Sequence, residues 1–145
     1  MKQIQHVQQI HPLGCMSACL AMVTGRPVKE IMDEFHNLYW KKKLKPEHIL
    51  IKHGVKFEYE KQSLDTALGS LDQGVYILSA PSLNAFNSMH AVVVDSRRAR
   101  CITEAKIYDP ARGTGADYYK QFGDGDFDLR HWQIVAEIHM ERLLH

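Results

Sequence analysis

The chain has 145 residues, a formal net charge of +1 at pH 7 and a hydrophobic content of 45%, which is the average for globular proteins. A chain of this length buries roughly 70% of its unfolded surface, so we expect a single domain over residues 1–145 that needs no metal or disulfide staple. The balanced charge excludes a global field that recruits nucleic acid or anionic lipid, and the composition excludes a coiled coil, a collagen-like repeat and a disordered tail.

The sequence gives no sign of targeting to a membrane. No apolar run approaches the roughly 18–20 residues of a membrane span, and the N-terminal stretch MKQIQHVQQIHPLG lacks the apolar core of a secretory signal. The chain has three cysteines, an odd number that does not suit a disulfide framework. We therefore expect a cytoplasmic protein with free thiols.

The first half of the chain is predicted to be helical. CMSACLAMVT (15–24) is apolar on nearly all sides and ends at Gly25, which is typical of a buried helix with a glycine cap. A second helix begins at Pro27. Its apolar residues have the i, i+3, i+4, i+7 spacing: Val28, Ile31, Met32 and Phe35. PEHILIKHG (46–54) predicts a third short helix, and KKKLK (41–45) is interpreted as a solvated loop.

The second half is predicted to form a sheet. Alternation of apolar and polar residues predicts a half-buried strand at Val55, Phe57 and Tyr59, and SLDTALGSL (63–71) predicts a short helix capped by Ser63. Three β-rich runs follow: VYILS (75–79), HAVVVD (90–95) and CITEAKIY (101–108). A last strand over 132–140 is predicted to have one solvent-exposed polar face and one buried apolar face. The fold class is therefore α+β, with N-terminal helices packed on a C-terminal antiparallel sheet.

Cys15 stands at the predicted start of the first helix, where free backbone N–H groups and the helix dipole stabilise a thiolate. Cys19 lies one turn later on the same face, but deeper. The alternative is that both are small core residues, because free cysteine is among the most buried residue types. A zinc site would use His11, Cys15 and Cys19, which are spaced by four. Such a site is disfavoured because Pro12 and Gly14 interrupt the helix and a fourth ligand is missing, so we expect no metal and no cofactor.

A nucleophilic thiolate needs a base, a group that orients the base and donors for the oxyanion. Gln9 lies on a short connection six residues before Cys15, and its amide can fold back over the helix N-terminus. Together with the Cys15 N–H group it would form an oxyanion hole, whereas the adjacent Gln8 is expected to project differently. His90 opens an apolar strand after a small-polar loop of the kind that borders a cleft. We therefore expect His90 to be the base.

Two acidic residues are candidates to orient His90. Asp95 lies five residues along the same strand, so its side chain is expected on the opposite face. A hairpin that turns near Ala99–Arg100 pairs position i with about 199 − i and places Asp109 opposite His90. Cross-strand neighbours have Cβ atoms ~5 Å apart, within reach of a carboxylate–imidazole hydrogen bond. Asp109 is therefore the expected orienter.

These residues give the chain a resemblance to the papain-like cysteine peptidases. It is most similar to the bacteriocin-leader-processing peptidase domains at the N-termini of ABC exporters and to their stand-alone relatives. The resemblance rests on QIHPLGC, the buried LAM helix, HAVVVD and IYDPARG, and covers roughly residues 5–115. It implies a papain-like fold and four roles: Cys15 as nucleophile, His90 as general base and acid, Asp109 as orienter and Gln9 as oxyanion donor.

The expected function is a cysteine hydrolase that cleaves a peptide or isopeptide bond in a peptide or protein substrate. One alternative is that the same triad performs acyl transfer, transglutamination or deamidation. Another is a catalytically silent binding module that serves as an adaptor, inhibitor or effector. The family usually has an acidic residue before the cysteine and a small residue after it, where this chain has Gly14 and Met16, so cleavage after a double glycine is not implied. The substrate and the oligomeric state stay open.

Overall fold

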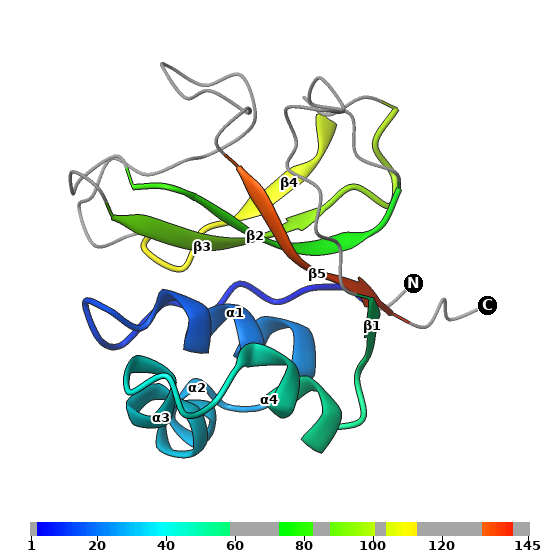
Figure 1. Cartoon of the computed structure of the whole chain (residues 1–145). Coiled ribbons are helices and arrows are strands. Elements are labelled where there is room, and N and C mark those ends of the chain that lie inside the picture. Colours follow the sequence, from blue (N-terminus) through cyan, green and yellow to red (C-terminus); the bar gives the residue numbers. More distant parts are fainter. Residues whose placement is uncertain (1–2, 59–72, 83–87, 101–103, 113–131, 141–145) are drawn as a thin grey trace.

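The computed structural model describes five stretches of the chain: residues 3–58, 73–82, 88–100, 104–112 and 132–140. The fold is α+β, as the sequence predicts, with helices from the first half on one side of an antiparallel sheet from the second half (Figure 1). Among the described residues, no helix combines the length and the apolar character needed to cross a membrane. Tyr59 and the helix predicted over 63–71 lie outside the described residues.

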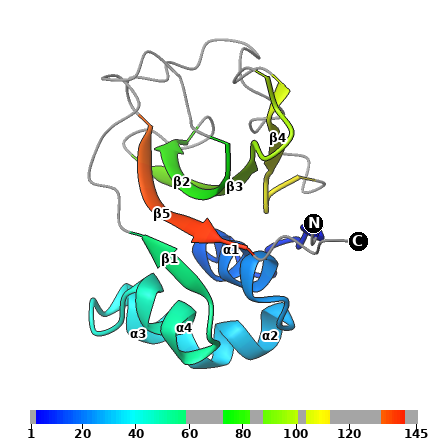
Figure 2. The same cartoon turned by 90° about the vertical axis from the view of Figure 1, so that its right-hand side faces the viewer.

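Helix α1 (Cys15–Thr24) confirms the predicted buried helix. All eight residues from Met16 to Val23 are buried, because the helix lies between the sheet and the other helices (Figure 2). Gly25 ends the helix in the left-handed conformation, with φ 72°, and its N–H group donates to the Ala21 carbonyl at 2.9 Å. A left-handed residue at this position strongly favours glycine.

The second predicted helix is a continuous helical segment with a widened middle turn. It comprises α2 (Val28–Ile31), a π-helical turn η1 (Met32–His36) and α3 (Asn37–Trp40). Ile31 and Phe35 are fully buried, as their helical spacing predicts. The π turn was not predicted, because the sequence pattern of one short widened turn differs little from that of an ordinary helix.

Helix α4 (Pro46–Lys52) confirms the third predicted helix, and its side chains Ile49 and Leu50 are buried in the core. The basic stretch 41–45 forms the loop between α3 and α4, and most of its residues are exposed. The chain then turns at Gly54 and enters the sheet at its edge.

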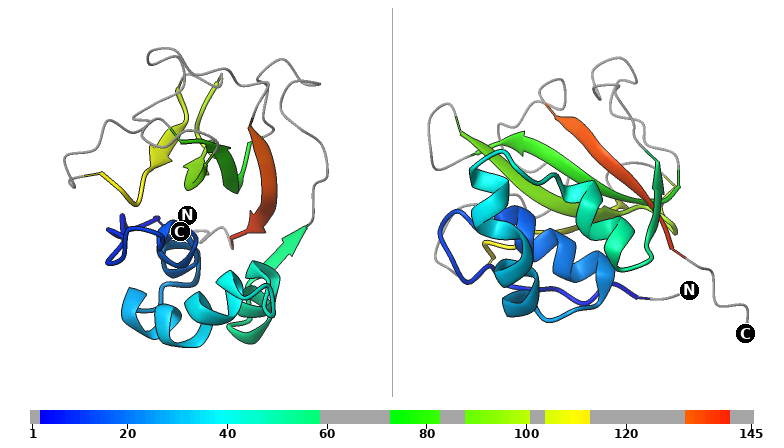
Figure 3. Two further views of the ribbon diagram at one scale, coloured as in Figure 1. Left: turned by 60° about the vertical axis from the view of Figure 1, so that its left-hand side comes forward. Right: turned by 60° about the horizontal axis from the view of Figure 1, so that its bottom comes forward.

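The sheet has five antiparallel strands in the order β1-β5-β2-β3-β4, and Figure 3 shows the helices gathered on one of its sides. The strands are β1 (Lys56–Glu58), β2 (Val75–Pro81), β3 (Met89–Asp95), β4 (Lys106–Tyr108) and β5 (Gln133–His139). All lie in predicted strand regions. Strand β4 is shorter than the predicted run 101–108, because Glu104 and Ala105 precede it without pairing and 101–103 lie outside the described residues.

Both faces of the central strands are apolar. Val75, Ile77 and Val93 belong to the cluster that includes α1, whereas the alternate residues Tyr76 and Val92 belong to a second cluster. Side chains alternate between the two faces of a strand. The sheet therefore separates two apolar clusters, and this explains the continuous apolar runs in β2 and β3.

A β-bulge divides β5 between the two clusters. Ala136 pairs with Ile77 and Ile134 pairs with Leu78, so Val135 is an extra residue in the ladder. The prediction of a single buried face is therefore wrong, because the bulge moves the apolar side chains of β5 from one face of the sheet to the other. The apolar residues before it join the second cluster and those after it join the α1 cluster: Trp132 and Ile134, then Ala136 and Ile138.

The pairing of β3 with β4 corrects the predicted register. Val93 pairs with Tyr108 and Asp95 with Lys106, so position i pairs with 201 − i instead of 199 − i. Asp109 is therefore not directly opposite His90. A slip of two residues keeps every side chain on its face, because the side-chain period of a strand is two, and the two side chains remain close.

Candidate active site

Three different elements bring the predicted triad residues together. Cys15 is the first residue of α1, His90 is the second residue of β3, and Asp109 follows the last residue of β4. Because α1 packs against β3 and β4 pairs with β3, the three residues come together near the start of β3.

His90 and Asp109 form a buried ion pair. The Nε2 atom of His90 lies 2.7 Å from Oδ1 of Asp109, and their side chains are only 5% and 2% exposed. The same Asp109 oxygen accepts a hydrogen bond from the Ala111 N–H group at 2.9 Å. Two donors on one oxygen hold the carboxylate in place, and the carboxylate fixes the orientation of the imidazole ring.

Cys15 is hydrogen-bonded to the other side of this histidine. Its side chain forms a hydrogen bond with His90, and the backbone groups of Ala91 and Met16 also form hydrogen bonds with the sulfur. Since Nε2 of His90 binds Asp109, Nδ1 is the ring nitrogen left for the thiol. The order thiol–imidazole–carboxylate is that of an activated nucleophile.

The electrostatics of the site favour a charged pair. Burial raises the pKa of Cys15, but the hydrogen bonds from His90, Ala91 and Met16 and the charge of His90 outweigh it, so the pKa is lowered overall. Burial lowers the pKa of His90, but the hydrogen bonds and charges of Asp109 and Cys15 raise it to about 9. The site therefore favours the thiolate and the imidazolium more than water does for an isolated cysteine and histidine.

A cleft of about 400 Å³ opens at Cys15 and His90. Three of its lining side chains are large, apolar and about half exposed: Leu13, Trp40 and Met89. Three others are small and polar: Ser79, Ser82 and Ser88. A cleft with an apolar rim and a few polar groups beside the reactive atoms is typical of a ligand-binding site.

Gln9 is not brought into this cleft. Its Nε2 atom donates to the backbone carbonyls of His11 and Pro12, at 3.0 and 3.1 Å, so both amide hydrogens are engaged. The side chain braces the turn that leads to Cys15. The role of Gln9 as an oxyanion donor remains a prediction, and it requires the amide to rotate away from these carbonyls.

Sequence reasoning missed the contact between the N-terminal stretch and Asp109. The Nε2 atom of His6 lies 2.6 Å from the Asp109 carbonyl oxygen. Because that oxygen only accepts, Nε2 must carry the hydrogen. The Gln9 N–H group donates to the Pro110 carbonyl at 2.8 Å. His6 thus helps to position Asp109, and with nine histidines in the chain no sequence signal distinguishes it.

The remaining predicted candidates lie apart from the triad chemistry. Asp95 binds Arg97, with Nη2 and Oδ2 2.7 Å apart, and does not orient His90. Cys15 and Cys19 are both free thiols. Cys19 is fully buried, and its pKa is well above the ordinary value because of burial and then the charges of Cys15 and Asp109. Of these two cysteines, which are the ones that the structure describes, only Cys15 has the environment of a nucleophile.

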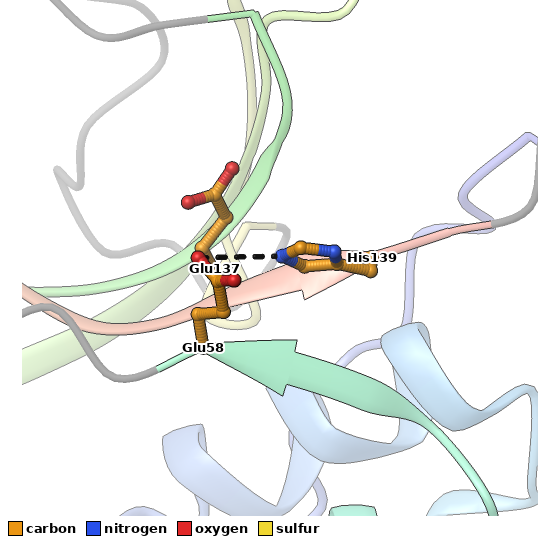
Figure 4. A group of neighbouring side chains, drawn as sticks. All are labelled: Glu58, Glu137 and His139. Atoms are coloured by element: carbon orange, nitrogen blue, oxygen red, sulfur yellow. Dashed lines mark ion pairs between the residues drawn. The ribbon is translucent and has the colours of Figure 1, made fainter.

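The possible zinc ligands do not come together in the part of the chain that the structure describes. The His11 ring packs against that of His36, with centroids 4.7 Å apart, while Cys15 bonds with His90. Glu58, Glu137 and His139 do lie close, with one ligating atom each within 4.8 Å of the others (Figure 4). These residues of β1 and β5 lie on the surface, and carboxylates beside a histidine are common there without a metal. We assign them no metal.

Comparisons of the chain with models of protein families, with curated proteins and with solved structures found no match.

Proposed function

We propose that the protein is a cysteine hydrolase with a papain-like fold that cleaves a peptide or isopeptide bond. The buried chain of contacts from the Cys15 thiol through His90 to Asp109, open to a cleft at the thiol, is the observation that carries this proposal. The fold assignment is supported by a helix that begins at the cysteine and packs on an antiparallel sheet whose adjacent strands position the histidine and the acid.

The reaction uses the groups of the site in sequence. The Cys15 thiolate attacks the carbonyl carbon, and the Cys15 N–H group together with the predicted donor Gln9 stabilises the oxyanion that forms. His90, as imidazolium, gives its proton to the leaving amine, and a thioester with Cys15 remains. His90 then takes a proton from a water molecule, the hydroxide attacks the thioester, and a carboxylic acid leaves as the Cys15 thiolate beside the His90 imidazolium is restored.

The buried Asp109 supports this cycle by holding the ring and stabilising the imidazolium. A buried charge that lacks a partner is costly, so an imidazolium at this depth needs the carboxylate. The Asp109 carboxylate is held by its contacts with His90 and Ala111. It therefore needs little reorganisation when the positive charge on the ring increases.

Incubation with a proteome-derived peptide library and mass spectrometry tests the proposal. We expect new peptide termini with the wild type and none with Cys15→Ala. Gln-to-Glu mass changes or amine adducts without new termini would instead assign the triad to deamidation or acyl transfer. Gln9→Ala is run in parallel: lower turnover with an unchanged alkylation rate of Cys15 would support Gln9 as the oxyanion donor, because such a donor acts only after attack. A changed alkylation rate would instead assign Gln9 to holding the turn before Cys15.

The exposed apolar rim of the cleft favours a second candidate function, a binding module for apolar peptide segments. Leu13, Trp40 and Met89 are each about half exposed, and clustered apolar exposure is typical of an interaction surface. An unreactive Cys15 together with saturable peptide binding that Trp40→Ala removes would support this function over catalysis.

A further inference from the structure

A second pocket lies at the far end of β3 from His90. It has a volume of about 160 Å³, and its lining includes Asp95, Arg97, Arg98, Lys106 and Tyr108. His90 and Asp95 are five residues apart on one strand, which separates them by roughly 17 Å. The pocket is therefore separate from the candidate active site.

Arg97 is one of the cations that line this pocket. Its side chain is only 9% exposed, and it binds Asp95 through two nitrogens, with Nε 3.0 Å from Oδ1 and Nη2 2.7 Å from Oδ2. The third nitrogen, Nη1, is buried and has no hydrogen-bond partner in the described part of the chain. An unpaired buried donor costs free energy, and an acceptor bound beside Arg97 would remove that cost if the guanidinium turned Nη1 towards it.

The acidic residues of the lining do not supply that acceptor. Asp95 is engaged by Arg97, and Glu104 is bound by Arg100, whose Nε lies 3.0 Å from Oε1. Arg98 and Lys106 also line the pocket. The charge of Lys106 acts on Asp95, its partner across the strands, but neither cation forms an ion pair within 4.0 Å among the described residues. With Glu104 neutralised by Arg100, the three lining cations exceed the one remaining carboxylate by two charges.

We propose that this pocket binds a phosphate group, either as the free anion or as a phosphate monoester. Two excess positive charges match a phosphate at neutral pH, which carries about −1.5 to −2, better than they match a carboxylate. A guanidinium nitrogen, an ammonium and a phenol around one small space suit the several acceptor oxygens of a phosphate. The volume is below the roughly 300–1,000 Å³ of a drug-sized ligand site, so the phosphate itself is the recognised part.

The proposal does not depend on the catalytic one, and binding is measured directly. Inorganic phosphate is titrated into the full-length ¹⁵N-labelled protein at constant ionic strength and pH 7.5, and the Arg97 Nε–Hε resonance is followed by NMR. We expect a saturable shift in the millimolar range. We expect Lys106→Gln and Arg98→Gln each to weaken binding at least about fivefold. Lys29→Gln removes an exposed cation on α2 and is expected to leave binding unchanged.

The other outcomes are equally specific. Acetate that binds as tightly as phosphate would overturn the assignment in favour of a carboxylate site. No saturable shift in the wild type, or equal binding by all three variants, would overturn the site itself. A sugar phosphate that binds at least as tightly as free phosphate would identify a monoester as the ligand, and much weaker binding would identify the free anion.

Discussion

His90 and His139 both lie on strands and both face a carboxylate, but their surroundings differ. The His90–Asp109 pair is almost fully buried at 2.7 Å, whereas the nearest atoms of His139 and Glu58 are 3.8 Å apart and their side chains are 45% and 68% exposed. Solvent screens the exposed pair, so it contributes little to stability. The His90–Asp109 pair differs from the exposed pair in its burial and in the neighbouring Cys15 sulfur.

A histidine beside a carboxylate is therefore not by itself a functional site. A histidine beside a carboxylate forms an exposed pair at His139 and Glu58, and a buried pair next to a thiol at His90 and Asp109. The difference arises from burial of the first pair and from Cys15 at the start of α1, whose sulfur forms a hydrogen bond with His90. Matched substitutions at the two pairs therefore test the account.

The largest expected effect is that of Cys15→Ala. Because the nucleophile itself is lost, we expect turnover of any substrate found to fall by at least about 10⁴-fold. The circular dichroism spectrum is expected to be unchanged, because the small side chain is replaced without a steric clash. Activity that survives this substitution would exclude Cys15 as the nucleophile.

Asp109→Asn is expected to lower turnover by about 10²- to 10⁴-fold, because the ring loses both its charged partner and its fixed tautomer. The pKa of His90, measured by NMR titration, is expected to fall from about 9, since the raising effect of the carboxylate is lost. Glu58→Gln is the matched change at the exposed pair and is expected to leave turnover within about twofold. Equal effects of the two substitutions would contradict the distinction between the pairs.

The buried pair also predicts a pH dependence of stability. The pKa of His90 is raised from 6.5 to about 9 on folding. The stabilisation is therefore fully present below about pH 6.5 and is lost as the pH rises through about 9. We expect His90→Gln to cost up to about 3 kcal/mol at pH 6 and progressively less towards pH 10, by urea denaturation. A cost for His90→Gln that stays constant with pH would contradict the raised pKa, and His139→Gln serves as the exposed control.

The smallest expected effect is that of His6→Ala. Loss of its hydrogen bond to the Asp109 carbonyl, worth about 1 kcal/mol, is expected to lower the alkylation rate of Cys15 about fivefold and to shift the pKa of His90. His6→Gln retains a donor and is expected to restore part of the rate. An unchanged pKa in His6→Ala would mean that His6 does not position Asp109.

The triad contacts could be predicted because each depends on local patterns. An apolar helix after a glycine places Cys15, an apolar strand after a polar loop places His90, and Pro110 ends the strand at Asp109. The two-residue register error did not separate His90 from Asp109, because it kept both on one face. The extra residue Val135 could not be predicted, since no glycine or proline interrupts the alternation there.

The hydrogen bonds around the site could not be predicted from the sequence, for a different reason. The hydrogen bonds of Gln9 and His6 depend on how a segment without helix or strand structure packs against Pro110 and Asp109. Likewise, the buried Arg97 sits in a turn where sequence patterns predict exposure. Such contacts follow from tertiary packing, and periodicity carries no information about them.

The most direct test of the account is the alkylation rate of Cys15 by iodoacetamide from pH 5 to 9, with the modified residue identified by mass spectrometry. In the wild type we expect rapid modification that persists well below pH 8, because the pKa of Cys15 is lowered by His90. In His90→Ala the dependence of the alkylation rate on pH is expected to become that of an ordinary thiol, with a midpoint at about pH 8.5. A midpoint at about pH 8.5 in both proteins, or no alkylation of Cys15, would contradict a histidine-activated thiolate.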